Sequence, residues 1–372
     1  MVYAQVGWAT AVAVVSMLGQ FLQGTSQFSP TACQSFEPFM NQYLVGQEPS
    51  LRVLTDAICD HISGLGGQAQ GFQGQKKPLV ISVHGPPGVG KSYFHQLAAQ
   101  VLYNGENANK VQGQHCPGRH CAGYKVLFGM DYTTHDRDEQ HAMLQKALLD
   151  HVSLHPQSFI VVEEYDKLDC YMRGFFRQIL QGGKVGNQSL GDSVVLLESN
   201  LGFSTLHRML EDVPSGQRED IDMDGVQRAL KNMVFTMWQK QKCEGFSDSQ
   251  KLLRNIDFFL PFYPLEKKHI EKLFAMRLDS FAETALSHGA VLTYNTSLVD
   301  FLANRVEFDG RYPIEGGKEV NTVTTGYLSR PFRLFLQSLE DSKEKNHAGD
   351  THPSSYRWVV QQNKMVDILL NS

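Results

Sequence analysis

The sequence predicts an α/β fold, with a parallel sheet in a three-layer domain followed by a smaller, mainly helical domain. The first domain is predicted because short apolar, β-branched runs alternate with helical stretches between residues 79 and 197. The second is predicted because the composition changes near residues 260–264, after which apolar residues recur at helical spacing. A length of 372 residues is sufficient for about two such domains.

Short apolar runs at residues 79–84, 125–132, 159–162 and 194–197 are expected to be buried parallel strands. Helices are expected where apolar residues share one stripe, directly after Lys91 and at residues 51–63, 139–152, 270–281, 298–305 and 327–339. Right-handed crossovers would bring the carboxyl ends of all these strands to one edge of the sheet. Polar residues that follow the strands are therefore expected to meet at that edge.

A glycine-rich motif joins the first expected strand to the helix that follows it. It fits the pattern G-x-x-x-x-G-K-[ST], which binds nucleotide phosphates, with Gly85, Pro86, Pro87, Gly88, Val89, Gly90, Lys91 and Ser92. The glycines let backbone N–H groups approach the phosphates, and the helix N-terminus adds positive potential. We expect Lys91 to neutralise the β- and γ-phosphates and Ser92 to ligate Mg²⁺.

Two carboxylates, Glu163 and Glu164, follow the strand expected at residues 159–162. This is the Walker B pattern, in which the first carboxylate holds Mg²⁺ and the second orients the attacking water. The usual first residue is aspartate, so Glu163 carries an extra methylene and the efficiency of hydrolysis stays open. The alternative is a pair of exposed acids at a strand end.

Two more polar residues are candidates for catalytic roles. Asn200 follows the strand expected at residues 194–197, where an amide can hold the water or the γ-phosphate. Lys318 follows two glycines in the second domain and is expected to reach the nucleotide from there. The alternatives are an ordinary turn asparagine and an ordinary loop lysine.

The charge and the N-terminal segment bear on partners and location. A net charge of -5 provides no basic field, so nucleic acid is not expected as a partner. Residues 6–22 are almost entirely apolar or small, and no charged residue precedes Glu37. This predicts a hydrophobic signal or membrane anchor. The alternatives are a buried helix and a chain that begins inside a longer protein.

Cysteines and glycosylation patterns are compatible with an oxidising compartment. The chain has 6 cysteines, two of which lie within the His- and Cys-containing segment 115–121. A local disulfide is favoured there, with free thiols and a zinc site as alternatives. Asn187 and Asn295 each open an N-x-[ST] sequence, which is a weak signal for N-glycosylation.

Together these segments resemble an AAA+ ATPase of the Clp branch and, within it, the torsins, over about residues 44–339. The segment 44–48, with Val45 and Gly46, looks like the box that contacts adenine. Segments 199–202 and 316–318 look like sensor 1 and sensor 2, and 215–221 and 259–266 look torsin-like. The resemblance implies ATP and Mg²⁺ as cofactors and protein remodelling in the lumen of the endoplasmic reticulum or the nuclear envelope.

The chain departs from the family at several positions. Torsins usually have Asn in place of Ser92 and Cys in place of Gly317. Asn255 takes the position of the Clp arginine finger, which is worth about 10³- to 10⁵-fold in rate. The resemblance therefore implies a membrane-protein activator that supplies the arginine, within a homo-oligomeric or mixed ring. No aromatic-glycine pore loop follows Met130, so threading through a central pore is not expected.

The predicted organisation has five parts: a hydrophobic segment (1–24), a linker (25–43), a large nucleotide-binding domain (44–262), a small helical lid (263–345) and a C-terminal tail (346–372). The expected function is a torsin-like ATPase whose client the sequence does not name. Two alternatives are a nucleotide-binding interaction module with little hydrolysis and a self-sufficient Clp-type unfoldase.

Overall fold

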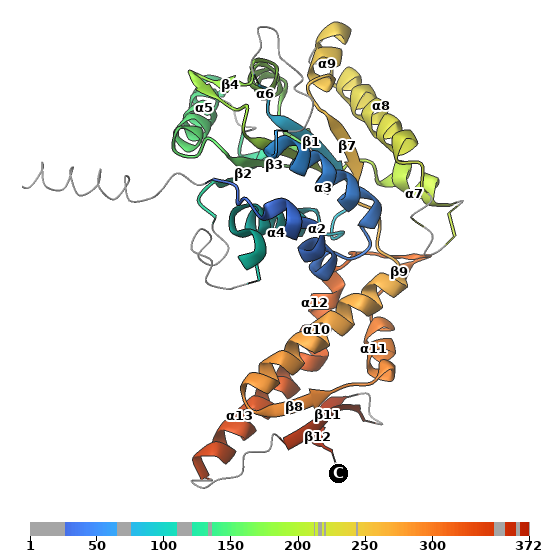
Figure 1. Ribbon diagram of the computed structural model, residues 1–372. Helices are drawn as coiled ribbons and strands as arrows, with labels where there is room; N and C mark the ends of the chain where they lie inside the picture. The colour runs from blue at the N-terminus through green and yellow to red at the C-terminus, as the bar shows by residue number, and fades with distance from the viewer. Residues whose placement is uncertain are drawn as a thin grey trace, which may run out of the picture.

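The computed structural model describes residues 27–64, 76–109, 121–132, 136–211, 213–214, 218, 221–242, 245–345, 354–361 and 365–371. Figure 1 shows a sheet-containing domain covered by helices, and below it a second domain that includes α10, α13 and β8. The hydrophobic segment expected at residues 6–22 lies outside the described residues. Among the residues that are described, no helix is both long enough and apolar enough to cross a membrane.

The first domain is built on a 5-stranded sheet with the order β2-β3-β6-β1-β7. Every pairing in it is parallel, which confirms the predicted fold class. The strands are β1 (Leu79–His84), β2 (Tyr124–Phe128), β3 (Phe159–Glu163), β6 (Val194–Ser199) and β7 (Phe258–Pro261). All residues of β1 and β6 are buried, as expected for central parallel strands with helices on both faces.

Two helical layers cover the sheet, because the side chains of each strand alternate between its faces. One face packs against α2 (Ala32–Tyr43), α3 (Glu48–Ile62) and α4 (Lys91–Asn104). The other packs against α5 (Arg137–Leu154), α6 (Cys170–Gly182), α7 (Phe203–Glu211), α8 (Met223–Gln241) and α9 (Phe246–Leu253). Shorter elements are the hairpin of β4 (Lys184–Val185) and β5 (Gln188–Ser189) and the 3-10 helices Gly105–Asn107, Gly129–Tyr132 and Tyr165–Lys167.

Several helices begin at residues whose side chains suit that position. Asp136, Asp169 and Asp222 accept backbone N–H groups in the first turns of α5, α6 and α8. Such caps satisfy N–H groups that have no partner inside the helix, and each contributes about 1 kcal/mol. The caps therefore fix where these three helices start.

The second domain combines helices with a small sheet. Its strands β8 (Ala290–Thr293), β11 (Ser354–Val360) and β12 (Val366–Leu370) form a 3-stranded sheet in the order β12-β11-β8. Its other elements are α10 (Lys267–Ser287), α11 (Thr296–Ala303), β9 (Phe308–Asp309), β10 (Tyr312–Pro313), α12 (Lys318–Thr324), the π-helix Thr325–Ser329 and α13 (Arg330–Lys345). Trp358 of β11 is buried in its core, beside Phe281 and Phe332.

The structure differs from the sequence expectations at both ends of the described chain. Most of the interval 25–43, expected as a linker, forms α2, which a disulfide between Cys33 and Cys59 joins to α3. Within the interval 346–372, expected as a tail, the described residues form β11 and β12. Both segments bury apolar side chains against elements that are distant in sequence, which local composition does not reveal.

The cysteines are oxidised in the described part of the chain. Cys121 and Cys170 are disulfide-bonded, in addition to the Cys33–Cys59 pair. The segment 115–120, considered as part of a local disulfide or a zinc site, lies outside the described residues. The disulfide at Cys121 leaves no thiolate there for zinc, and the predicted local pairing stays a prediction.

Candidate functional site

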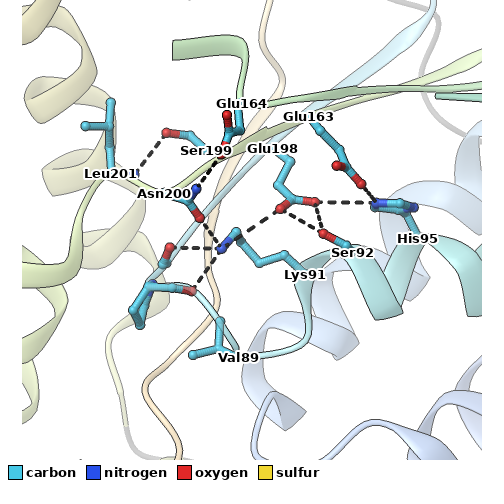
Figure 2. A network of polar contacts seen from close by, with 12 residues as sticks. Val89, Lys91, Ser92, His95, Glu163, Glu164, Glu198, Ser199, Asn200 and Leu201 are labelled. Carbon is cyan, nitrogen blue, oxygen red and sulfur yellow. Dashed lines mark hydrogen bonds and ion pairs between the residues drawn. The ribbon is translucent and has the colours of Figure 1, made fainter. Parts of the chain in front are cut away.

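The glycine-rich motif connects β1 to α4 at the carboxyl edge of the sheet, as expected (Figure 2). Gly88 and Gly90 have φ angles of 77° and 98°, which L side chains rarely adopt. Lys91 is the first residue of α4, so the backbone N–H groups of the first turn face the loop. The local sequence therefore builds the strand, loop and helix geometry that phosphate binding requires.

Lys91 is buried and lies inside the loop. Its Nζ donates to the carbonyl oxygens of Gly85 and Pro86 at 3.0 and 2.9 Å, and to Oδ1 of Asn200 at 2.9 Å. Burial lowers the pKa of Lys91 below its ordinary value; the charge of Lys318 acts in the same direction, while Glu198 and other carboxylates oppose it. A bound phosphate would add negative charge beside this buried ammonium group and favour its charged form.

Asn200 connects Lys91 to the second carboxylate of the Walker B pair. Its Nδ2 donates to Oε1 of Glu164 at 3.2 Å, while its Oδ1 accepts from Lys91 (Figure 2). Glu164 has a φ of 52°, a left-handed conformation that is uncommon for residues other than glycine. This turn directly after β3 separates the direction of Glu164 from that of Glu163. The structure thus brings together three predicted residues, namely Lys91, Asn200 and Glu164.

A second polar cluster lies on the α4 side of the sheet and includes two residues that the sequence analysis missed. Oγ of Ser92 donates to both carboxylate oxygens of Glu198 at 3.1 Å. Nε2 of His95 lies 2.9 Å from Oε1 of Glu163 and 3.4 Å from Oε2 of Glu198. Ser92 and Glu163 were predicted as a Mg²⁺ pair, but the hydroxyl of Ser92 contacts Glu198 (Figure 2).

Strand alternation explains why these side chains meet. Phe159 and Val161 of β3 and Val194 and Leu196 of β6 pack on the α2–α4 side of the sheet. Glu163 and Glu198 continue the same alternation. His95 lies one helical turn after Lys91, on the helix that covers this face. The sequence therefore contained a signal for this cluster. Glu163 and Glu198 follow the two-residue period of their strands, and His95 follows Lys91 by four residues on the helix.

His95 is held in a fixed orientation between the two carboxylates and a tyrosine. Its side chain is 1% exposed, and its Nδ1 lies within hydrogen-bond distance of the hydroxyl of Tyr124. Burial lowers the pKa of His95, but hydrogen bonds and charge from Glu163 and Glu198 outweigh this, so the pKa is raised above its ordinary value. Without a bound cation, a proton on His95 thus stabilises the two carboxylates.

The segment expected to contact adenine lies beside the loop, at the junction of the two domains. Val45 is buried, and the carbonyl of Gly46 accepts from Nη1 of Arg218 at 3.0 Å. Gln47 donates to the carbonyl of Val89 at 3.2 Å. Nη2 of Arg218 also contacts Glu266 at 3.2 Å, and Arg311 of the second domain contacts the same carboxylate at 3.0 Å. These contacts hold the expected adenine segment next to the phosphate-binding loop.

The second domain also contacts the loop directly. The N–H of Gly317 donates to the carbonyl of Gly88 at 2.7 Å. A Cβ added to Gly316 would lie 2.7 Å from the same carbonyl oxygen, so only glycine allows this approach. Lys318 follows as the exposed first residue of α12 and is near enough to affect the pKa of Lys91. The predicted sensor 2 lysine therefore lies beside the loop.

The chain is similar in sequence to known chaperone proteins. The chain is 21% identical over 341 residues to the chaperone protein ClpB of Blochmanniella floridana, which is 90% of this chain and 35% of that protein. It is 22% identical over 274 residues to the probable chaperone protein ClpB 1 of Chlorobaculum tepidum, which is 72% of this chain and 57% of that protein. No family model matches the chain.

A torsin-like protein of Drosophila melanogaster is also similar, with 25% identity over 251 residues, covering 65% of this chain and 66% of that protein. The chain spans about a third to three fifths of the ClpB relatives it matches, 35% and 57% in the two cases above. These similarities relate the chain to the Clp and torsin proteins as a group. They do not distinguish a torsin from another Clp-related protein.

Proposed function

We propose that the chain is an ATPase that binds ATP with a divalent cation and uses its hydrolysis for protein remodelling. The observation that carries this proposal is the connected set of Lys91, Asn200 and Glu164 beside the glycine-rich loop. The set joins a phosphate-binding group to a carboxylate that can orient water, at the strand ends where ligands bind in parallel sheets. The names of the ClpB relatives, which are chaperone proteins, support the remodelling role.

Each residue has a defined role in the proposed reaction. Lys91 and the loop N–H groups bind the β- and γ-phosphates and stabilise charge on the transferred phosphoryl group. Glu164 orients the attacking water, and Asn200 positions Glu164 relative to Lys91. A divalent cation held by Ser92 and the neighbouring carboxylates would supply further positive charge beside the phosphates.

The proposal includes a lid movement of the second domain. Arg218 and Arg311 hold Glu266 from both sides of the domain junction, and Gly317 contacts the loop at Gly88. A nucleotide that enters beside Gly88 would change the contacts of this segment. Closure of such a domain excludes water from the reaction and completes the site.

We further propose that the arginine finger comes from a partner, within a homo-oligomeric or mixed ring. Asn255, at the position where the Clp finger is expected, donates to the carbonyl of Lys251 within its own helix end. Arg254 beside it is exposed at the end of α9. We therefore propose, more specifically, that the ATPase depends on an activator as torsins do. The alternative is a self-sufficient Clp-type unfoldase.

An oxidising, lumenal compartment such as the endoplasmic reticulum is proposed as the location. The disulfide between Cys33 and Cys59 supports this, because such bonds persist mainly outside the cytosol. Asn187 is exposed in the turn between β4 and β5, where a glycan can be attached. Endoglycosidase treatment of the cellular protein provides the check, since a mobility shift is expected and its absence in Asn187→Gln would locate the glycan.

The proposed function is tested by ATP hydrolysis of the oxidised chain, alone over a concentration series and with a membrane extract of the source cells. We expect little activity alone and clear activity with extract. Glu164→Gln is expected to lower turnover about 10²- to 10⁴-fold while ATP still binds, because water is no longer oriented by a base. Glu283→Gln, exposed on α10, is the matched control.

Each outcome of this test has a distinct meaning. Normal hydrolysis by Glu164→Gln would contradict the assigned role of Glu164. Strong activity of the chain alone, rising with concentration, would favour the self-sufficient unfoldase. ATP binding without turnover under any condition would instead favour a nucleotide-binding interaction module.

A further inference from the structure

The cluster of His95, Glu163 and Glu198 has the composition and spacing of a metal site. Each residue comes from a different element, namely α4, β3 and β6, and one ligand atom of each lies within 4.8 Å of the others. Figure 2 shows the imidazole of His95 pointing between the two carboxylates, with Ser92 beside Glu198. Three elements thus direct nitrogen and oxygen donors at one point.

The separations between these donor atoms match those of ligands that share one ion. Ligand bonds of about 2.0–2.2 Å place neighbouring ligands of a tetrahedral or octahedral ion about 2.8–3.6 Å apart. The distances from His95 Nε2 to Glu163 and Glu198 are 2.9 and 3.4 Å. Ser92 Oγ lies 3.1 Å from both oxygens of Glu198. Small adjustments would therefore bring all of them around one ion.

The imidazole is already oriented as metal-binding histidines are. Such histidines usually bind the metal through one nitrogen while the other nitrogen is hydrogen-bonded, which fixes the tautomer and the ring. In His95, Nε2 faces the carboxylates and Nδ1 contacts the hydroxyl of Tyr124. The ring is 1% exposed, so packing also fixes its position.

The charges around the cluster favour a cation. The side chains of Glu163 and Glu198 are only 18% and 8% exposed, so their charges are partly removed from water. Lys91 lies 4.0 Å from Glu198, but its Nζ is already bound by Gly85, Pro86 and Asn200. Apart from His95, the two partly buried carboxylates thus have little direct contact with a positively charged group. A divalent ion would balance their negative charge.

We propose that His95, Glu163 and Glu198 form a binding site for a divalent transition-metal ion such as Mn²⁺ or Zn²⁺, with Ser92 as a further oxygen donor. An imidazole with carboxylates suits these ions, whereas Mg²⁺ prefers oxygen donors alone. The donor set therefore fits a transition-metal ion better than the predicted Mg²⁺. A position of the ion beside nucleotide phosphates rests on the proposed function. Binding of the ion to the nucleotide-free chain does not depend on that function.

The test is a titration of the oxidised, nucleotide-free chain with Co²⁺, whose visible absorption reports nitrogen and oxygen coordination. We expect one Co²⁺ to bind per chain. Zn²⁺ or Mn²⁺ should displace it at concentrations about tenfold or more lower than the Mg²⁺ concentration that displaces it. His95→Gln and the nearly isosteric Glu198→Gln are each expected to weaken binding by about tenfold or more. Circular dichroism would establish that each variant folds.

The matched control is His207→Gln, which removes another histidine paired with a glutamate. His207 lies 3.4 Å from Glu211 on the exposed surface of α7, and we expect this variant to bind Co²⁺ as the original chain does. Absence of binding in the original chain, or unchanged binding in folded His95→Gln and Glu198→Gln, would overturn the proposal. Equal displacement by Mg²⁺ would overturn the choice of ion.

The result is separable from the proposed ATPase. Specific Co²⁺ binding without ATP turnover under any condition would leave the metal site intact and contradict the ATPase. ATP turnover without specific Co²⁺ binding would support the ATPase and overturn the metal site.

Discussion

The two halves of the site differ in how the chain builds them. The phosphate half, residues 85–91 with Asn200 and Glu164, depends mainly on one contiguous loop, where backbone groups and Lys91 supply the binding atoms. The cation half, Ser92 with His95, Glu163 and Glu198, is assembled from side chains that are distant in sequence. A short sequence motif can therefore predict one half of a site, whereas the other half depends on strand register and helix packing.

The halves also differ in their electrostatics. Lys91 of the phosphate half has a lowered pKa, mainly because it is buried. His95 of the cation half has a raised pKa, because two carboxylates outweigh its burial. A bound anion would therefore favour the charged form of Lys91, whereas a proton or a metal ion would balance the charges of Glu163 and Glu198. Variants that affect one half without the other test this division.

Among variants that separate the two halves, the largest effect is expected from Lys91→Met, which removes the charge of the phosphate half and keeps most of the side-chain volume. Loss of charge-assisted hydrogen bonds is worth about 1.5–3 kcal/mol, so ATP affinity should fall about ten- to a hundredfold in equilibrium binding. Co²⁺ binding to the nucleotide-free chain should be unchanged or tighter, because a cation 4.0 Å from Glu198 is removed. Parallel loss of both would show that the halves are not separate; Lys240→Met on α8 is the control.

A smaller effect is expected from His84, which directly precedes the glycine-rich loop. His84 is buried at the end of β1, beside Ser82 and Tyr165, and burial together with Lys91 lowers its pKa from 6.5 to about 3. Below pH 6.5 the unfolded chain binds a proton that the folded chain does not, so stability falls as the pH falls. From pH 7.5 to 5.5 this loss is about 1.4 kcal/mol.

The measurement is urea unfolding of the original chain and of His84→Asn at both pH values. The variant should be less stable at pH 7.5 and should lose about 1.4 kcal/mol less between the two pH values. His207→Gln, an exposed histidine, is the control. An identical pH dependence in His84→Asn and the original chain would contradict a neutral, buried His84.

Gly316→Ala is expected to weaken ATP binding less than Lys91→Met does, and it tests the contact of the second domain with the phosphate half. Gly316 has a φ of 61°, and its added Cβ would lie 2.7 Å from the carbonyl oxygen of Gly88. Gly310→Ala is matched to it, with a φ of 60° and nothing within 4 Å of the added Cβ. Both should lose about 1–2 kcal/mol of stability through the left-handed alanine, and Gly316→Ala should lose more because its Cβ also meets the backbone of Gly88. Only Gly316→Ala should also weaken ATP binding, and equal binding in both variants would argue against the lid contact.

Sequence reasoning located the glycine-rich loop because its residues are adjacent and their spacing is diagnostic. It also located Glu163, Glu164 and Asn200, because each follows an expected buried strand. It missed His95 and Glu198 because each looks ordinary in its local sequence. They become neighbours of Glu163 only when β3 pairs with β6 and α4 covers that face. Applying the strand period to residues 159–163 and 194–198 would have placed both glutamates on one face.

The same division applies to the fold. The central strands were predictable because their apolar runs are long and buried on both faces. The edge strand β7 was missed because it has only 4 residues and ends at Pro261. β11 was missed because it pairs with β8, about 60 residues earlier, as with Ser354 and Ala290. Pairing at such separations follows from tertiary packing rather than from local propensity.

The most direct test of the account is whether both halves act on one nucleotide. The measurement is equilibrium binding of a fluorescent ATP analogue with Mg²⁺ or with Mn²⁺, for the original chain and for His95→Gln. We predict affinity about tenfold or more higher with Mn²⁺ in the original chain, and nearly equal affinities in His95→Gln. Equal affinities with the two ions in the original chain would contradict the account.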